Sequence, residues 1–195
     1  MFPKPKPQLK PNTYAYESEP LVKPTGFREY DARWLLGSEI NLMGLQALGM
    51  GLGTLIRDMG VKPEIEVFDT GDLVFADDLI AEGVLDGPGV YSIVMGTKYG
   101  IPADPEAMIY CKNRLPKGAI WQGFGISKHT WAMAAQSVIL GGNVRTGFED
   151  STYLGPGKQA KSNGTMVMQA AELVERLGRE VATPGEARKQ LGLPH

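Results

Sequence analysis

Hydrophobic residues along most of the chain follow two patterns, one typical of strands and one typical of helices. After residue 60, short apolar stretches rich in β-branched and aromatic residues predict strands, and each is followed by apolar residues at helical spacing. The predicted strands are 64–69, 90–95, 119–124 and 143–147, and the predicted helices are 72–82, 105–114, 130–140 and 164–177. Strand–helix alternation favours a parallel sheet with right-handed crossovers, so we expect an α/β fold. Four such units are half of a (β/α)8 barrel, which usually needs about 250 residues.

The two flanks follow different patterns. Residues 1–27 contain six of the 14 prolines and predict an extended, irregular N-terminal segment, which leaves 28–195 as the folded domain. A helix is expected over 39–59, where four internal glycines make it dependent on tertiary packing. Near the C-terminus, Thr183-Pro184-Gly185-Glu186 is a capping-box pattern that predicts a short helix through Leu191.

Composition argues against several functions. The longest uncharged run, 40–56, contains four glycines and falls short of the roughly 18 apolar residues that a membrane-spanning helix needs. With 20 basic and 22 acidic residues, the formal net charge of −2 argues against nucleic-acid or anionic-membrane binding. The single Cys111 allows neither an internal disulfide nor a cysteine-based zinc site, so we expect a reducing, cytoplasmic setting.

The clearest candidate chemistry lies at the carboxyl end of the predicted strand 143–147, where parallel α/β folds carry their catalytic residues. Strand alternation places Arg145 and Glu149 on one face and turns Asp150 away at the strand's end. Two adjacent carboxylates suit a division of roles, because one can bind a metal cation while the other accepts a proton. The guanidinium would tune the pKa of the proton acceptor. The alternative is an ordinary ion pair at the rim.

Other strand ends offer weaker candidates. Glu64 and Glu66 share a face, and we favour Glu66 because it lies nearer the expected catalytic rim; the alternative is a solvated sheet edge. Gly123 and Gly125 would let the backbone approach a phosphate, although tight turns explain them equally well. His129 is compatible with a metal ligand, an acid–base group or a loop residue.

The run GGNVRTGFEDSTYLGPGKQAKSN (141–163), followed by 173–193, resembles the β-keto acid cleavage enzymes, whose founding activity is cleavage of 3-keto-5-aminohexanoate. The segments GVKPEIEVFDTGDL (60–73) and GFGISKHTWAMAA (123–135) are similar to that family as well, and the likeness covers about 28–193. The resemblance implies a zinc-dependent enzyme with a (β/α)8 TIM-barrel fold. Such an enzyme converts a β-keto acid and acetyl-CoA into acetoacetate and a new acyl-CoA.

The same resemblance implies roles for individual residues. Glu149 would be the carboxylate zinc ligand, Asp150 the general base, and Arg145 its charged partner, while Glu66 would contribute to the substrate pocket.

The candidates for binding the acetyl-CoA are Gly123, Gly125 and Lys128. Lys128 and Thr130 stand where the family usually has Arg and Gln, which puts a bidentate anion contact there in doubt.

The paired histidine zinc ligands of the family lie on an early barrel strand that this chain does not match. The likeness begins after the fourth strand, so the chain resembles the C-terminal half of the barrel, strands five to eight. We therefore expect a homo-oligomer, or a partner that supplies a missing N-terminal half. The alternatives are a catalytically inactive half-barrel that serves as an assembly or binding module, and an unrelated aldolase or dehydratase with Lys98 as a Schiff-base lysine. The identity of the β-keto acid does not follow from these residues.

Overall fold

The structure of the protein, a computed structural model, describes residues 22–29 and 31–193. The chain divides into two compact units, Met1–Lys62 and Pro63–His195. The predicted N-terminal segment 1–27 lies mostly outside the described residues. Only its end is described, and there a short 3₁₀ helix, η1 (Pro24–Gly26), interrupts the expected extended chain.

The first unit is built around one helix, α2 (Leu42–Asp58), which confirms the helix expected over 39–59. Asn41 caps this helix, because its side-chain oxygen accepts a hydrogen bond from the Gly44 amide at 2.7 Å. Among the described residues, no helix is both long enough and apolar enough to cross a membrane.

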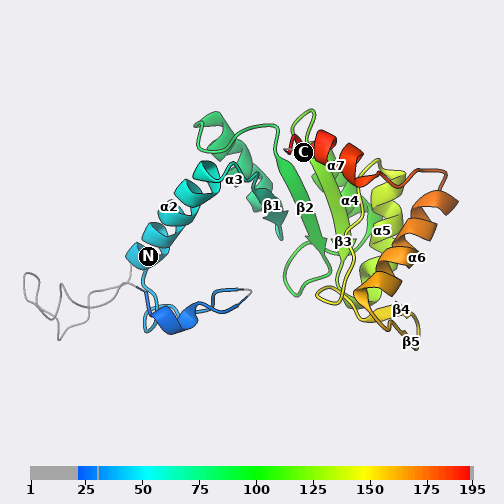
Figure 1. The fold of residues 1–195 in the computed structure, drawn as a ribbon, viewed down its shortest axis with the longest axis horizontal. Coiled ribbons are helices and arrows are strands. Elements are labelled where there is room, and N and C mark those ends of the chain that lie inside the picture. The colour runs from blue at the N-terminus through cyan, green and yellow to red at the C-terminus, as the bar shows by residue number, and fades with distance from the viewer. Residues whose placement is uncertain (1–21, 30, 194–195) are drawn as a thin grey trace, which may run out of the picture. The chain divides into compact units, whose positions relative to one another are not determined.

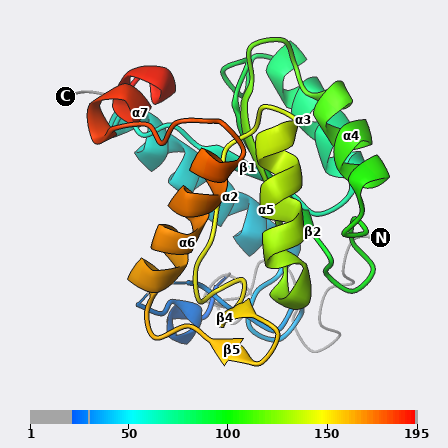
Figure 2. The same cartoon turned by 90° about the vertical axis from the view of Figure 1, so that its right-hand side faces the viewer.

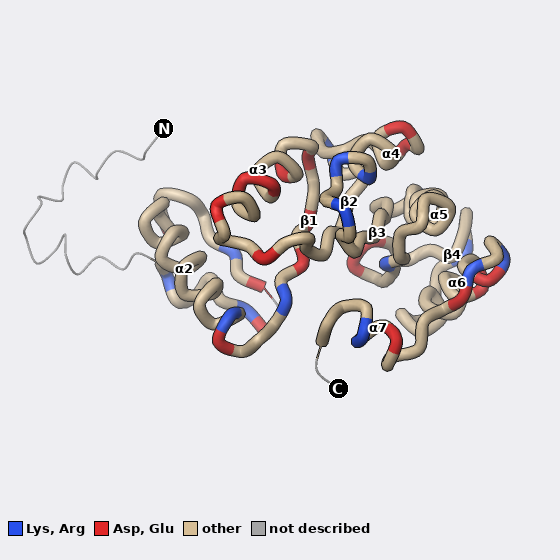
Figure 3. The backbone as a smooth tube through the Cα atoms, turned by 90° about the horizontal axis from the view of Figure 1, so that it is seen from above, with Lys and Arg blue, Asp and Glu red and all other residues tan. Residues whose placement is uncertain are grey.

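The second unit contains a parallel three-stranded sheet in the order β1-β2-β3, with the helices that follow its strands along one side (Figures 1 and 3). Its elements are β1 (Glu64–Val67), α3 (Thr70–Ala81), β2 (Val90–Met95), α4 (Pro105–Arg114), β3 (Ile120–Gly125), η2 (Ser127–His129), α5 (Thr130–Ile139), β4 (Tyr153–Gly155), β5 (Lys158–Gln159), α6 (Asn163–Arg176) and α7 (Pro184–Leu191). Three predicted strand–helix units and both C-terminal helices are thus confirmed to within a few residues.

The fourth predicted strand, 143–147, is wrong. Asn143 makes one bridge to Gln122 of β3, with its amide donating to the Trp121 carbonyl oxygen at 2.8 Å, and the ladder stops there. A turn follows at once, in which the amides of Asp150 and Ser151 both donate to the Gly147 carbonyl oxygen. Pairing on one side only, together with this turn, leaves the segment as extended chain beside the sheet.

A short antiparallel hairpin, β4–β5, was not expected from the pattern. It encloses Pro156 and Gly157, and Gly157 has the left-handed φ of +71° that such a tight turn requires. In Figure 2 the hairpin lies beyond the start of α6. The Gly155-Pro156-Gly157 run indicates a tight turn, but no hairpin was predicted from it.

The two faces of the sheet have opposite character because side chains alternate along each strand. Tyr91, Ile93 and Met95 of β2 point into the hydrophobic core, where they pack against α3 and α4 with Leu73 and Met108. The other face carries polar side chains in register, since Glu66 pairs with Ser92 and Ser92 pairs with Gln122. This polar face is where the candidate chemistry lies.

Cys111 of α4 gives a direct probe of the core, because its side chain is fully buried. Burial raises the pKa of the thiol, and the charge of Asp69 adds to this effect. We therefore expect Cys111 to react with a thiol reagent at pH 8 at least about 100-fold more slowly in the native protein than in urea, as expected for a buried thiol with little thiolate. Reaction at the unfolded rate under native conditions would contradict this packing.

Candidate active site

One guanidinium, that of Arg145, holds three carboxylates at the carboxyl end of the sheet. Its Nη1 donates to Glu66 Oε1 at 2.7 Å, and its Nη2 donates to Glu149 Oε2 at 2.9 Å. The third carboxylate, Asp150, accepts from both Nε at 3.2 Å and Nη2 at 3.3 Å. We call Glu66, Arg145, Glu149 and Asp150 the Arg145 cluster.

The cluster joins parts of the chain that are far apart in the sequence. Glu66 comes from β1, whereas the other three residues come from the extended segment and turn after α5. The turn is tied to the end of β3, because the Ser127 amide donates to the Asp150 carbonyl oxygen at 2.7 Å. Ser127 has a left-handed φ of +58°, an uncommon conformation for a residue with a Cβ. Sequence reasoning missed this link, because a strained serine leaves no pattern in the chain.

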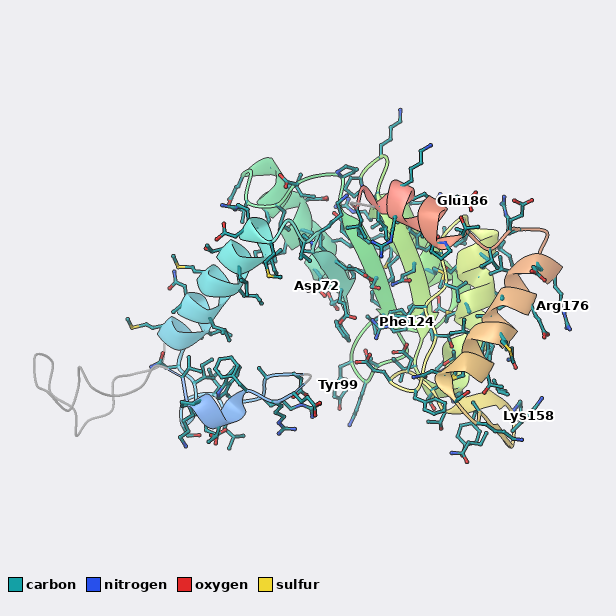
Figure 4. The ribbon with its side chains drawn as sticks, viewed as in Figure 1. Asp72, Tyr99, Phe124, Lys158, Arg176 and Glu186 are labelled. Carbon is teal, nitrogen blue, oxygen red and sulfur yellow. The ribbon has the colours of Figure 1, made fainter. Side chains whose placement is uncertain are left out.

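Phe124 of β3 completes the setting of Arg145, whose Cζ lies 4.3 Å from the centre of the buried ring. A guanidinium over an aromatic face is attracted by the ring's charge distribution, most strongly where water is excluded. Figure 4 shows Phe124 at the lower end of the sheet, where the strands end. Side chains two residues apart on a strand point to the same face, so Phe124 lies on the same polar face as Gln122. This spacing was the signal in the sequence for its orientation.

The carboxylates of the cluster differ in exposure, and the difference corrects one prediction. The Asp150 side chain is 4% exposed, while that of Glu149 is 83% exposed. Strand geometry had placed Glu149 with Arg145 and turned Asp150 away, but the turn at 147–151 brings Asp150 inward instead. Asp150 is therefore the buried partner of Arg145, and Glu149 reaches it from the solvent side.

The electrostatics of the cluster follow from this burial. Burial raises the pKa of Asp150; the Arg145 hydrogen bonds and charge oppose that shift, while Glu149 and Glu66 add to it. Burial works against the charge of Arg145, but the bonds and charges of Asp150 and Glu66 outweigh it and raise the pKa of Arg145. With three carboxylates around one guanidinium, the ionised cluster carries an excess of negative charge.

Next to Glu66 on the same face, Glu64 belongs to a second polar group. Glu64 Oε1 accepts hydrogen bonds from Ser92 Oγ and from Gln122 Nε2, the latter at 2.7 Å, and Gln122 Nε2 also contacts Ser92 Oγ at 2.7 Å. These contacts link all three strands across the polar face. The preference for Glu66 over Glu64 as a site residue remains a prediction, although the structure brings only Glu66 to Arg145.

The remaining predicted residues lie apart from the cluster. His129 is half-buried against Gly96, and Lys128 and Lys98 are exposed at neighbouring strand ends. A Cβ on Gly123 would lie 2.8 Å from Met108 Cε, and one on Gly125 would lie 2.6 Å from the His129 carbonyl oxygen. Close packing thus accounts for both glycines, and their part in binding acetyl-CoA, with that of Lys128, remains a prediction.

No group of three or more His, Cys, Asp or Glu side chains that could hold a metal ion occurs in the described part of the chain. Glu149 is the one predicted ligand, and its carboxylate is engaged by Arg145. One carboxylate does not make a zinc site, which usually takes three or four protein ligands. The residues present therefore do not by themselves fit a zinc ion.

A cleft of about 680 Å³ lies beside the cluster. Arg145 and Thr146 line it together with apolar residues of α5 and α6, namely Val138, Val167, Ala170, Ala171 and Val174. The Thr146 hydroxyl is buried and has no hydrogen-bond partner within the described residues, which is unusual for a buried polar group.

Comparison with known proteins shows which family the chain is similar to. The sequence profile of the beta-keto acid cleavage enzyme family matches residues 46–193. A 3-keto-5-aminohexanoate cleavage enzyme of Fusobacterium nucleatum is 39% identical over 72% of this chain and 51% of its own length. A 3-oxoadipate:acetyl-CoA acetyltransferase of Cupriavidus necator is 39% identical over 73% of this chain and 51% of its own length. The solved apo structure of ObcA has a similar fold, with a TM-score of 0.62 at 16% identity over 80% of this chain and 40% of ObcA.

The parallel sheet, its covering helices and this match define an α/β protein of an enzyme family. The chain belongs to the beta-keto acid cleavage enzymes, as its resemblance to them implied. It spans about half the length of the curated relatives that it matches.

Removing the guanidinium tests whether the cluster stabilises the fold. Arg145→Ala leaves Asp150 buried without its charged partner and should lower the free energy of unfolding by about 2 kcal/mol at pH 7. Glu149→Gln is the matched control and should change it by less than about 0.5 kcal/mol, because Glu149 is exposed. Urea unfolding measures both, and equal effects of the two variants would contradict the assigned burial.

The same variant has a predictable pH dependence. Because the pKa of Asp150 is raised on folding, ionising Asp150 opposes folding, so its stabilising contribution is present at low pH and is lost as pH rises through the folded-state pKa. Without Arg145 to compensate its charge, ionised Asp150 destabilises the folded state further, so the stability lost as pH rises becomes larger. The Arg145→Ala deficit should therefore be largest at neutral pH and shrink as acid protonates Asp150; a deficit independent of pH would point to lost packing alone.

Proposed function

We propose that the chain is the C-terminal half of a TIM-barrel enzyme that converts a β-keto acid and acetyl-CoA into acetoacetate and a new acyl-CoA. The observation that carries the proposal is the Arg145 cluster, which gathers its carboxylates at the carboxyl end of a parallel sheet, where such folds place catalytic residues. The names of the relatives point the same way, since several contain a 3-keto or 3-oxo acid and three contain acetyl-CoA.

The proposed chemistry begins with removal of a proton next to the keto group of the β-keto acid. Asp150 accepts this proton in our proposal, because its buried carboxylate has a raised pKa and is therefore a better base than a solvated aspartate. The carbanion, on the carbon between the keto and carboxylate groups, attacks the thioester carbon of acetyl-CoA and expels the CoA thiolate. The thiolate then adds to the keto carbon of the original acid, and the bond between that carbon and the former carbanion carbon breaks. This gives the acyl-CoA and the enolate of acetoacetate, which takes back the proton from Asp150. Arg145 is a positioning residue, since two of its nitrogens hold Asp150 and Phe124 supports its plane.

We include zinc dependence in the proposal only for an enzyme in which another segment supplies the remaining zinc ligands. Glu149 would be this chain's ligand, and the excess negative charge of the cluster favours a dication nearby. The other ligands must come from a complementary segment, because the described residues do not provide them. When bound, such a metal would act as a Lewis acid towards a carbonyl oxygen.

We further propose that the second unit needs an added N-terminal half, either from a longer chain or from another subunit. The open cleft supports this assembly, since further strands would cover it and would offer a hydrogen-bond partner to the buried Thr146 hydroxyl, which has none within the described residues. The competing hypothesis is an inactive half-barrel that serves as a binding module, which the single metal ligand favours.

Reconstitution with the N-terminal half of the Fusobacterium relative tests the enzyme proposal. Acetoacetate formation from a β-keto acid and acetyl-CoA should appear only in the mixture, and Asp150→Asn should slow it about 10²–10⁴-fold. Glu149→Gln should lower both zinc content and activity, whereas Asp150→Asn should keep zinc bound. Asp78→Asn, an exposed position on α3, is the control and should leave both unchanged.

Two outcomes would count against this account. A properly assembled, zinc-loaded complex without acetoacetate formation supports the binding-module hypothesis. Zinc loss in Asp150→Asn with zinc retained in Glu149→Gln means that the two roles are reversed.

A further inference from the structure

The loop after β2 presents an aromatic side chain to solvent in a conformation that aromatic residues rarely adopt. Tyr99 is 90% exposed and has a φ of +68°, in the left-handed region that favours glycine and asparagine. Its ring packs on no core residue, but Lys98 Nζ lies 4.8 Å from the ring centre. Strained residues of this kind concentrate at binding sites, so the outlier calls for a functional explanation.

The loop beneath Tyr99 is firmly held. The Gly96 amide donates to the Ile101 carbonyl oxygen at 2.8 Å, and the Ile101 amide donates to the Phe68 carbonyl oxygen at 2.9 Å. Ile101 is buried, so the loop is anchored at both ends to the core and to the chain that leaves β1. Lys98 and Tyr99 therefore project from a fixed base.

We propose that Lys98 and Tyr99 bind the nucleotide end of coenzyme A, an inference that rests on the proposed function. The open face of the Tyr99 ring stacks on the adenine, and the Lys98 ammonium pairs with the phosphates. Stacking suits an exposed platform, because a base has a π-face whatever its edge contacts. Nothing in the packing of the loop requires a tyrosine at this position, where asparagine would fit with less strain.

The position of the loop fits this ligand. Figure 4 shows Tyr99 and Phe124 at the same end of the sheet, which is the end that carries the Arg145 cluster. The long pantetheine arm of coenzyme A separates its thioester from its nucleotide, so the nucleotide is expected on the surface at some distance from the reacting carbon. Lys128 is exposed at the end of the adjacent strand and adds positive charge on that side.

Calorimetric titration of this chain with coenzyme A, with 3′,5′-ADP and with pantetheine tests the proposal without any cleavage reaction. Tyr99→Asn should weaken the binding of coenzyme A and of 3′,5′-ADP about tenfold or more, the scale on which a stacked base is lost. Tyr99→Phe keeps the ring and should change affinity less than about twofold, since stacking does not use the hydroxyl. Lys98→Gln should weaken binding and reduce its dependence on salt, whereas Lys98→Arg should restore both. Pantetheine binding should not respond to any of these changes.

Thermal unfolding separates this role from a structural one. Because asparagine tolerates the left-handed conformation, Tyr99→Asn should raise the melting temperature while it lowers affinity. A merely structural tyrosine would lower both together.

The proposal is overturned if the wild-type chain binds neither coenzyme A nor 3′,5′-ADP at millimolar concentrations, or if Tyr99→Asn binds both as wild type does. It is also overturned if Tyr99→Asn changes only self-association, which would make the loop an interface between copies. Loss of acetoacetate formation in the reconstituted enzyme with intact nucleotide binding would instead count against the proposed function alone.

Discussion

The pairing of Arg145 with Asp150 is the constraint on which the candidate site depends. A buried carboxylate is unfavourable unless a cation and hydrogen bonds compensate it, and Arg145 provides both through two of its nitrogens. The same guanidinium reaches Glu66 on β1 and rests on Phe124 of β3. One side chain thereby ties the turn after α5 to both edge strands of the sheet.

The sheet itself determines which residues can take part. Alternation along β1 and β3 sends one set of side chains into the hydrophobic core and leaves Glu66, Gln122 and Phe124 on the opposite face. That polar face would be the interior of the barrel in the proposed assembly. Its carboxylates make sense there, because a buried charge persists in a protein when a partner or a function requires it.

Much of the fold could be predicted because its signals are local. Helix caps, helical spacing and apolar strands can each be recognised within about a dozen consecutive residues. Asp104 before α4 and Ser162 before α6 are examples of such caps. The failure at 143–147 was different, since whether an extended segment becomes a strand depends on neighbours that the local sequence does not specify. The hairpin β4–β5 was missed although its turn residues are visible in the sequence.

Four of the candidate site residues, Glu66, Arg145, Glu149 and Asp150, lie together in the structure, joined by the ion pairs of Arg145. Their roles in catalysis and metal binding remain predictions, and Gly123, Gly125 and Lys128 lie apart from them. Which carboxylate is buried depends on the turn at Gly147, and strand alternation gave the wrong answer. Phe124 lies against Arg145, and the Ser127 amide holds the Asp150 carbonyl oxygen; both are tertiary contacts, which the sequence alone does not specify.

A double-mutant cycle between Arg145 and Asp150 tests the central claim most directly. The free energy of unfolding is measured for the wild type, Arg145→Ala, Asp150→Asn and the double variant. If Arg145 and Asp150 form the buried pair described here, the single effects should not add, and the interaction energy should fall between about 0.5 and 3 kcal/mol. Additivity within about 0.3 kcal/mol would show that the two residues do not interact, and the site built on them would have to be abandoned.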